Sequence, residues 1–151
     1  MADGLPRAPV APTRKLPRAL RDLAAAARAD LVRVVDDPKL AECCVFGSFY
    51  LQTLALEQGF AVEVAAGHVP RRGTILGVTS HAWCTFDGWV VDITATQFWQ
   101  VPEVYVVSAA HRRYSEVHAR GLEVLLHCAD PYKLAKRLHA VGIGRLARVK
   151  P

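Results

Sequence analysis

The chain has 151 residues, of which 52% are hydrophobic, and a formal net charge of +5. This size and apolar content predict one compact domain with a substantial core. The apolar runs are too short for a membrane span, and residues 1–17 lack the apolar stretch of a signal peptide, so we expect a cytoplasmic protein without a membrane partner. Secretion as an effector is the alternative location.

Three segments precede the first strand-like pattern. Residues 1–17 contain four prolines and predict a flexible arm, which leaves 18–151 as the single domain. Residues 18–35 repeat apolar side chains at spacings of three and four, the pattern of an amphipathic helix. Residues 42–58 predict a second helix that is apolar on most sides and capped by Gly59, and such a helix belongs in the middle of a fold.

After Gly59 the apolar period changes to that of strands. Segments rich in Val, Ile, Trp and Tyr are separated by Gly, Pro or Asp-Gly turns. The expected strands are residues 60–67, 74–78, 81–86, 89–94 and 104–108. Asp87-Gly88 is a strong hairpin signal. Helices followed by consecutive antiparallel strands predict an α+β domain with the central helix packed on the sheet.

The final part of the chain returns to a helical pattern. Residues 116–128 are ambiguous, whereas residues 131–142 begin with a proline and end at a glycine, as helices often do. No internal repeat is visible in the sequence.

The basic residues lie towards both ends of the chain, with no recognition-helix or stacking motif among them. An acidic protein partner or a solvated surface therefore explains the charge better than a nucleic-acid ligand. Four cysteines, two of them adjacent, are too few for a disulfide scaffold and predict reduced thiols. The histidines show no ligand spacing, so neither a metal site nor a cofactor is expected.

A histidine and an aspartate stand on the two arms of the predicted hairpin. Strand alternation places His81 and Trp83 on one face, and Val90 and Asp92 on one face of the other arm. Across a two-residue turn, His81 lies beside or diagonal to Asp92, within reach of an imidazole–carboxylate hydrogen bond. Such a bond fixes the tautomer of a general base. The alternative reading is a structural polar pair.

The nucleophile that would complete this site is Cys44. Cys44 falls in the first turn of the predicted central helix, where the helix dipole lowers the pKa of a thiol. Its backbone N–H could stabilise an oxyanion, together with the side chain of Gln97 or Trp83. Buried free cysteines are usually inert, which is the competing interpretation of Cys44 and the expected role of Cys43, Cys84 and Cys128.

The order of these motifs resembles the transglutaminase-like branch of the papain-like cysteine enzymes. "CVFGSFYLQTLALEQG" begins with Cys44 and ends at Gly59, and it is followed by "VEVAAG", by "HAW" at residues 81–83 and by "DG". The resemblance is closest to small peptidase-type members such as the leader peptidases of lasso-peptide maturation, and it covers roughly residues 42–98. Only Cys44 keeps the fifteen-residue step to Gly59. No Gln or Asn precedes the cysteine at the papain-type oxyanion position.

The resemblance implies a papain-like fold and a triad of Cys44 as nucleophile, His81 as acid and base, and Asp92 as orienting residue. The expected function is cysteine acyl transfer from an amide of a peptide or protein substrate through a thioester, with peptide hydrolysis slightly favoured. Glutamine deamidation and transglutamination share the first half of this reaction and stay open. So do a non-catalytic papain-like module that binds peptides and a small nucleic-acid-binding accessory.

Overall fold

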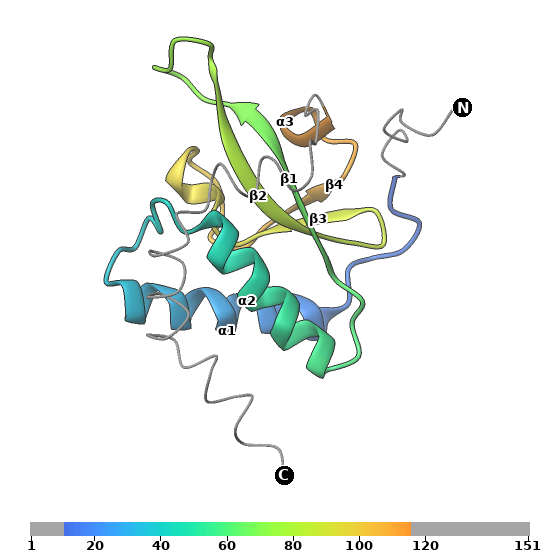
Figure 1. Ribbon diagram of the computed structural model, residues 1–151. Coiled ribbons are helices and arrows are strands. Elements are labelled where there is room, and N and C mark those ends of the chain that lie inside the picture. Colours follow the sequence, from blue (N-terminus) through green and yellow to red (C-terminus); the bar gives the residue numbers. More distant parts are fainter. Residues whose placement is uncertain (1–10, 116–151) are drawn as a thin grey trace, which may run out of the picture.

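The computed structural model describes residues 11–115, which form an α+β structure of helices and an antiparallel sheet (Figure 1). The two long helices come first and the strands follow them, as the sequence predicts. The elements are α1 (Arg18–Val35), α2 (Cys44–Glu57), β1 (Glu63–Pro70), β2 (Val78–Phe86), β3 (Trp89–Asp92), the 3₁₀ turn η1 (Ala95–Gln97), β4 (Tyr105–Ser108) and α3 (Arg112–Ser115). The strands pair in chain order, β1-β2-β3-β4.

Helix α1 has the predicted bounds and buries one stripe of its surface. Leu20, Ala24, Ala27 and Leu31 are fully buried at spacings of four, three and four. The helix ends at Asp36, which adopts a left-handed conformation and donates its N–H to the carbonyl of Val32. Of the described helices, none is long and apolar enough to cross a membrane.

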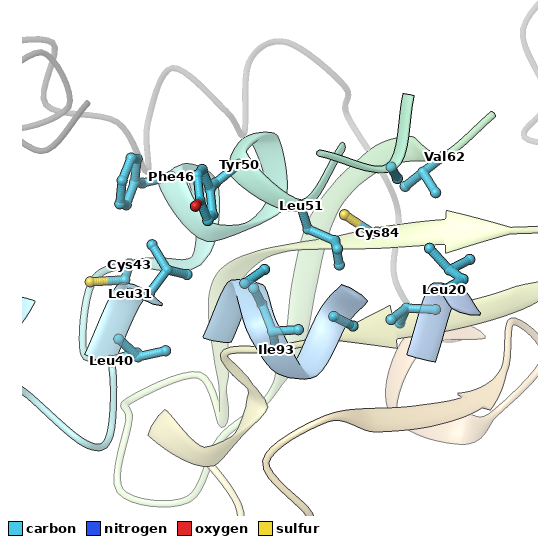
Figure 2. Close-up of a cluster of buried hydrophobic side chains, with 14 of the residues drawn as sticks. Leu20, Leu31, Leu40, Cys43, Phe46, Tyr50, Leu51, Val62, Cys84 and Ile93 are labelled. Atoms are coloured by element: carbon cyan, nitrogen blue, oxygen red, sulfur yellow. The ribbon is translucent and has the colours of Figure 1, made fainter. Parts of the chain in front are cut away.

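Helix α2 lies in the middle of the described fold, which confirms the prediction of a central helix. It packs against α1 and against the sheet at β1 and β2. Side chains on several sides of α2 are therefore buried, and Figure 2 shows Phe46 and Leu51 among side chains of α1, β2 and the segment after β3. The helix is slightly shorter than expected, and Gly59 closes it with a φ of 84°.

Two expected strands are corrected by the structure. The first begins later than predicted, at Glu63, and runs to Pro70. Residues 74–78 do not form a separate strand, because the ladder between β1 and β2 continues to the pair Pro70↔Val78 and the residues between them form its tip. Ile75 and Leu76 are apolar residues that favour a strand, but both side chains are exposed to solvent.

Glycine geometry explains this hairpin tip. Gly73 and Gly77 both have positive φ values, of 85° and 69°, which an extended strand does not allow. The Arg71 N–H donates to the carbonyl of Gly77 at 2.8 Å, and the Thr74 hydroxyl lies 3.1 Å from the carbonyl oxygens of Arg71 and Val78. Two glycines therefore outweigh the strand preference of the residues between them.

The β2–β3 hairpin forms at Asp87-Gly88 as predicted. Both turn residues have positive φ values, 49° and 81°, as a type I′ turn requires. The ladder between these strands ends at Cys84↔Val91, whereas β3 continues its pairing with β4 as far as Asp92↔Tyr105. The strands β2 and β3 therefore separate beyond Cys84 and Val91, at the end of the sheet where His81 and Asp92 stand.

Part of the predicted arm contacts the domain. Leu16 is buried in the main core, Arg14 forms a 3.3 Å ion pair with Asp87, and the Trp89 indole donates to the Arg14 carbonyl at 2.7 Å. The division into an arm of residues 1–17 and a single domain of 18–151 stays a prediction. The helical patterns at residues 116–128 and 131–142 lie outside the described residues, as does Cys128.

Candidate active site

His81 and Asp92 form a buried hydrogen bond that bridges the separation between β2 and β3. His81 Nε2 lies 2.6 Å from Asp92 Oδ2, and the two side chains are 0% and 1% exposed. The predicted imidazole–carboxylate hydrogen bond is therefore confirmed. A pair this deeply buried is shielded from water, so its geometry is set by the protein and its electrostatic interaction is strong.

The Asp92 carboxylate receives further hydrogen bonds. The Thr94 N–H donates to Oδ1 at 2.9 Å, and the Tyr114 hydroxyl donates to Oδ2 at 2.6 Å. Burial alone raises the pKa of Asp92, but the charge of His81 and these hydrogen bonds outweigh it, so the pKa lies below its usual value. Asp92 is therefore an ionised acceptor, and Nε2 of His81 carries the proton that the carboxylate accepts.

The other ring nitrogen of His81 is not used by the fold. Nδ1 is buried and has no hydrogen-bond partner in the structure. The imidazole is held from the side by aromatic rings, with Phe98 edge-on at a centroid distance of 4.9 Å and Trp83 at 5.9 Å. A buried nitrogen without a partner costs free energy, so His81 is arranged for one bond to Asp92 and leaves Nδ1 for another group.

Cys44 is the first residue of α2 and packs against the strand that carries His81. It shares a small buried cluster with Val45, Ala66 and Ala82, and Ala82 is the chain neighbour of His81. Cys44 is 6% exposed, compared with 0% for Cys43 and 1% for Cys84. Cys44 thus lies at the positive end of the helix dipole and is the most accessible of the described cysteines.

The first turn of α2 lies close to the chain that follows Asp92. A Cβ atom added at Gly47 would lie 3.0 Å from Thr94 Cγ2 and 3.2 Å from Leu31 Cδ1. Only glycine permits this approach without displacement of a neighbour. The first turn of α2 therefore contacts the chain on both sides of the separation between β2 and β3, at Ala82 and at Thr94.

The other described cysteines belong to the core, as expected. Cys43 lies beside Leu31 and Leu40 in Figure 2, and its thiol donates to the Ala41 carbonyl. The Cys84 thiol donates to the Ser48 carbonyl, and burial raises its pKa. No disulfide joins two of the three described cysteines. The Cys84 thiol is thus a poor nucleophile, since the thiolate is the reactive form.

Gln97 is held against the loop that leads into α2. The backbone N–H of Glu42 donates to Gln97 Oε1 at 3.3 Å, while Gln97 Nε2 is buried without a partner. Glu42 and Leu40 have left-handed φ values of 61° and 54°, which are strained for residues other than glycine. Gln97 therefore presents a fixed, unused N–H donor close to the N-terminus of α2.

Trp83, the other candidate oxyanion donor, lies in a different cluster. It packs against Val69, Val90 and Tyr114, with a ring-centroid distance of 5.0 Å to Tyr114. This cluster does not include Cys44. Gln97 is therefore the better supported of the two candidates.

Arg28 connects the chain that follows Asp92 to the loop that precedes Cys44. Its guanidinium is buried and donates to the carbonyl of Ile93 at 2.6 Å and to that of Pro38 at 2.7 Å. Ile93 directly follows Asp92, and Pro38 belongs to the loop before Cys44. Burial lowers the pKa of Arg28, opposed by Glu103 and Asp92, but a guanidinium stays charged in proteins.

Sequence reasoning missed Tyr114, Arg28 and the role of Thr94. Thr94 had a usable signal, because an aspartate commonly accepts a hydrogen bond from the N–H two residues later. Tyr114 and Arg28 had none, since they lie 22 and 65 residues from their respective partners Asp92 and Ile93. Within residues 11–115 there is no group of three or more His, Cys, Asp or Glu side chains that could hold a metal ion.

Comparison of the chain with protein-family models, with curated proteins and with solved structures gives no match. The arrangement of Cys44, His81, Asp92 and Gln97 is therefore the basis for a functional interpretation.

Proposed function

We propose that this protein is a cysteine acyl-transfer enzyme that attacks an amide with Cys44, using His81 as acid and base and Asp92 as the orienting carboxylate. The observation that carries the proposal is the buried 2.6 Å bond between His81 and Asp92, which leaves Nδ1 of His81 without a partner. A nitrogen in this state is suited to exchange a proton with a nucleophile.

The reaction follows from these roles. His81 Nδ1 takes the proton of the Cys44 thiol, and the sulfur attacks the amide carbonyl carbon to form a tetrahedral oxyanion. Gln97 Nε2 is the side-chain donor for this oxyanion. The imidazolium then protonates the departing amine, which leaves a thioester on Cys44. Water attacks the thioester, the carboxylic acid departs and the thiol is restored.

The finer assignment rests on the resemblance to transglutaminase-like enzymes of the papain-like superfamily. A cysteine at the start of a helix, a histidine on a strand and an aspartate on the next strand support that fold and a peptide or protein substrate. Hydrolysis of a peptide bond and deamidation of glutamine are the first reactions to test, because water resolves the thioester in both, whereas transglutamination needs a second site for an amine. Glutamine deamidation and transglutamination use the same thioester.

The first experiment measures the rate of iodoacetamide alkylation at each cysteine against pH, by peptide mass spectrometry. Cys43 and Cys84 serve as internal controls because both are in the core. We expect selective alkylation of Cys44 below pH 7, slowed about tenfold or more in His81→Ala. Slow alkylation of Cys44 that is indifferent to His81 would contradict the proposal and favour a non-catalytic peptide-binding module.

A second experiment identifies the reaction. A proteome-derived peptide mixture is incubated with the wild type and with Cys44→Ala, and the products are read by mass spectrometry. New peptide termini report hydrolysis, and conversion of glutamine to glutamate reports deamidation. Neither change should occur with Cys44→Ala, and products that persist in this variant would exclude Cys44 as the nucleophile.

A further inference from the structure

Tyr114 is joined to the candidate active site by one short, buried hydrogen bond. Its hydroxyl donates to Asp92 Oδ2 at 2.6 Å, and that same oxygen accepts the hydrogen bond from His81 Nε2 at 2.6 Å. Tyr114 is 4% exposed. The phenol, the carboxylate and the imidazole therefore form a continuous buried chain in which one oxygen atom serves two donors.

The fold holds this phenol in place from several sides. Its ring packs on Trp83 at a centroid distance of 5.0 Å and lies edge-on to Trp99 at 5.8 Å. Its backbone N–H donates to the carbonyl of His111 at 2.9 Å. These contacts surround the ring, so the fold directs the Tyr114 hydroxyl at Asp92.

In the hydrogen bond between Tyr114 and Asp92, the phenol is the donor and the carboxylate is the acceptor. Burial and the neighbouring Asp92 charge raise the pKa of Tyr114, so the phenol stays neutral and donates its proton. A buried carboxylate that accepts several hydrogen bonds stays ionised, because each donor stabilises the charged form. Two donors on Oδ2 and the Thr94 N–H on Oδ1 also restrict the rotation of the carboxylate.

We propose that Tyr114 is a positioning residue, which holds the Asp92 carboxylate in the orientation that fixes His81 with Nε2 protonated and Nδ1 available for proton exchange. The role in catalysis rests on the proposed function of Cys44 and His81. Tyr114 acts through Asp92, to which its hydroxyl donates.

Tyr114→Phe removes the hydroxyl and keeps the ring. Tyr105→Phe is the matched control, since Tyr105 belongs to the same aromatic cluster, with a ring centroid 6.3 Å from that of Tyr114. The Tyr105 hydroxyl accepts a hydrogen bond from Arg113 at 2.8 Å and has none to Asp92. A loss of stability through disturbed aromatic packing or a lost hydroxyl is therefore common to both variants.

Two measurements on both variants and the wild type test the proposal. The titration of the Asp92 carboxyl carbon is followed by NMR, and Cys44 alkylation is followed against pH. In Tyr114→Phe we expect the Asp92 titration to move up by about one to two pH units, because one charge-assisted hydrogen bond is lost. We expect Cys44 alkylation at neutral pH to slow about threefold to tenfold, because orientation of the base is only partly lost. Tyr105→Phe should change neither quantity.

The outcomes separate this inference from the proposed function. If the wild type shows alkylation of Cys44 that depends on His81 while Tyr114→Phe changes neither quantity, the positioning role is overturned and the proposed function stands. A fall in thermal stability of Tyr114→Phe with unchanged alkylation also overturns it, since a purely structural role predicts this. If wild-type alkylation is itself indifferent to His81, the proposed function fails first and the positioning role fails with it.

Discussion

Gly47 and Thr94 approach each other so closely that a Cβ atom at Gly47 would lie 3.0 Å from the Thr94 methyl group. This contact seats the first turn of α2, and with it Cys44, against the chain that leaves Asp92. Gly47→Val would force Thr94 or Leu31 out of place, and we expect a loss of about 1–3 kcal/mol in the free energy of unfolding. Urea denaturation measures the loss, and Ser48→Ala in the same helix is the comparison. An unchanged denaturation midpoint for Gly47→Val would contradict a tight contact of Gly47 with Thr94 and Leu31.

Arg28→Met should destabilise the fold and disturb the site together. The substitution removes two hydrogen bonds from a charged donor and leaves the carbonyls of Ile93 and Pro38 without it. We expect a cost of about 3 kcal/mol or more in the free energy of unfolding. Arg33→Met, which removes an exposed pair with Asp30 on the same helix, should cost at most about 0.5 kcal/mol. Equal effects of the two substitutions would contradict a joining role for Arg28.

Gln97→Ala tests the oxyanion assignment. If Gln97 Nε2 donates to the tetrahedral intermediate, kcat for the substrate found in the peptide screen should fall by about a hundredfold or more, with little change in KM. Trp83→Phe is the paired variant, because Trp83 lies in the separate aromatic cluster and its indole is the other candidate donor. A large loss of kcat in Trp83→Phe, with Gln97→Ala unaffected, would reverse the assignment.

Asp92→Asn should lower activity less than Cys44→Ala does. The amide keeps the size of the carboxylate, so the orientation of His81 is partly maintained, whereas loss of Cys44 removes the attacking atom. The rate of substrate turnover for the two variants decides this order. Activity of Asp92→Asn equal to that of the wild type would show that the carboxylate has no orienting role.

The stability contribution of Asp92 should depend on pH. Its pKa is lower in the folded protein than in the unfolded chain, so the folded state binds fewer protons and the contribution is fully present above the unfolded pKa. As the pH falls through about 4 and below, the difference in unfolding free energy between the wild type and Asp92→Asn should therefore narrow. Denaturant unfolding at a series of pH values measures it. If the difference in unfolding free energy between the wild type and Asp92→Asn widened in acid, the pKa of Asp92 would be raised by folding and not lowered.

Much of the described fold follows from local patterns in the sequence. Helix 18–35, the apolar central helix and the hairpin at Asp87-Gly88 each depend on residues close in the chain, and so does the His81–Asp92 pair, which a two-residue turn brings together. The strand preference of single residues predicts a strand at residues 74–78, but Gly73 and Gly77 make this segment the tip of the hairpin.

The tertiary structure decided what surrounds that pair. Tyr114 reaches Asp92, Arg28 reaches Ile93, and Gln97 reaches the backbone of Glu42 across 55 residues. These contacts connect elements that no local periodicity relates, and they form only when α1, α2 and the sheet pack together. The sequence alone therefore determined which residues have the chemistry for a thiol-based site, and packing determined which donors hold the carboxylate and which nitrogen stays available.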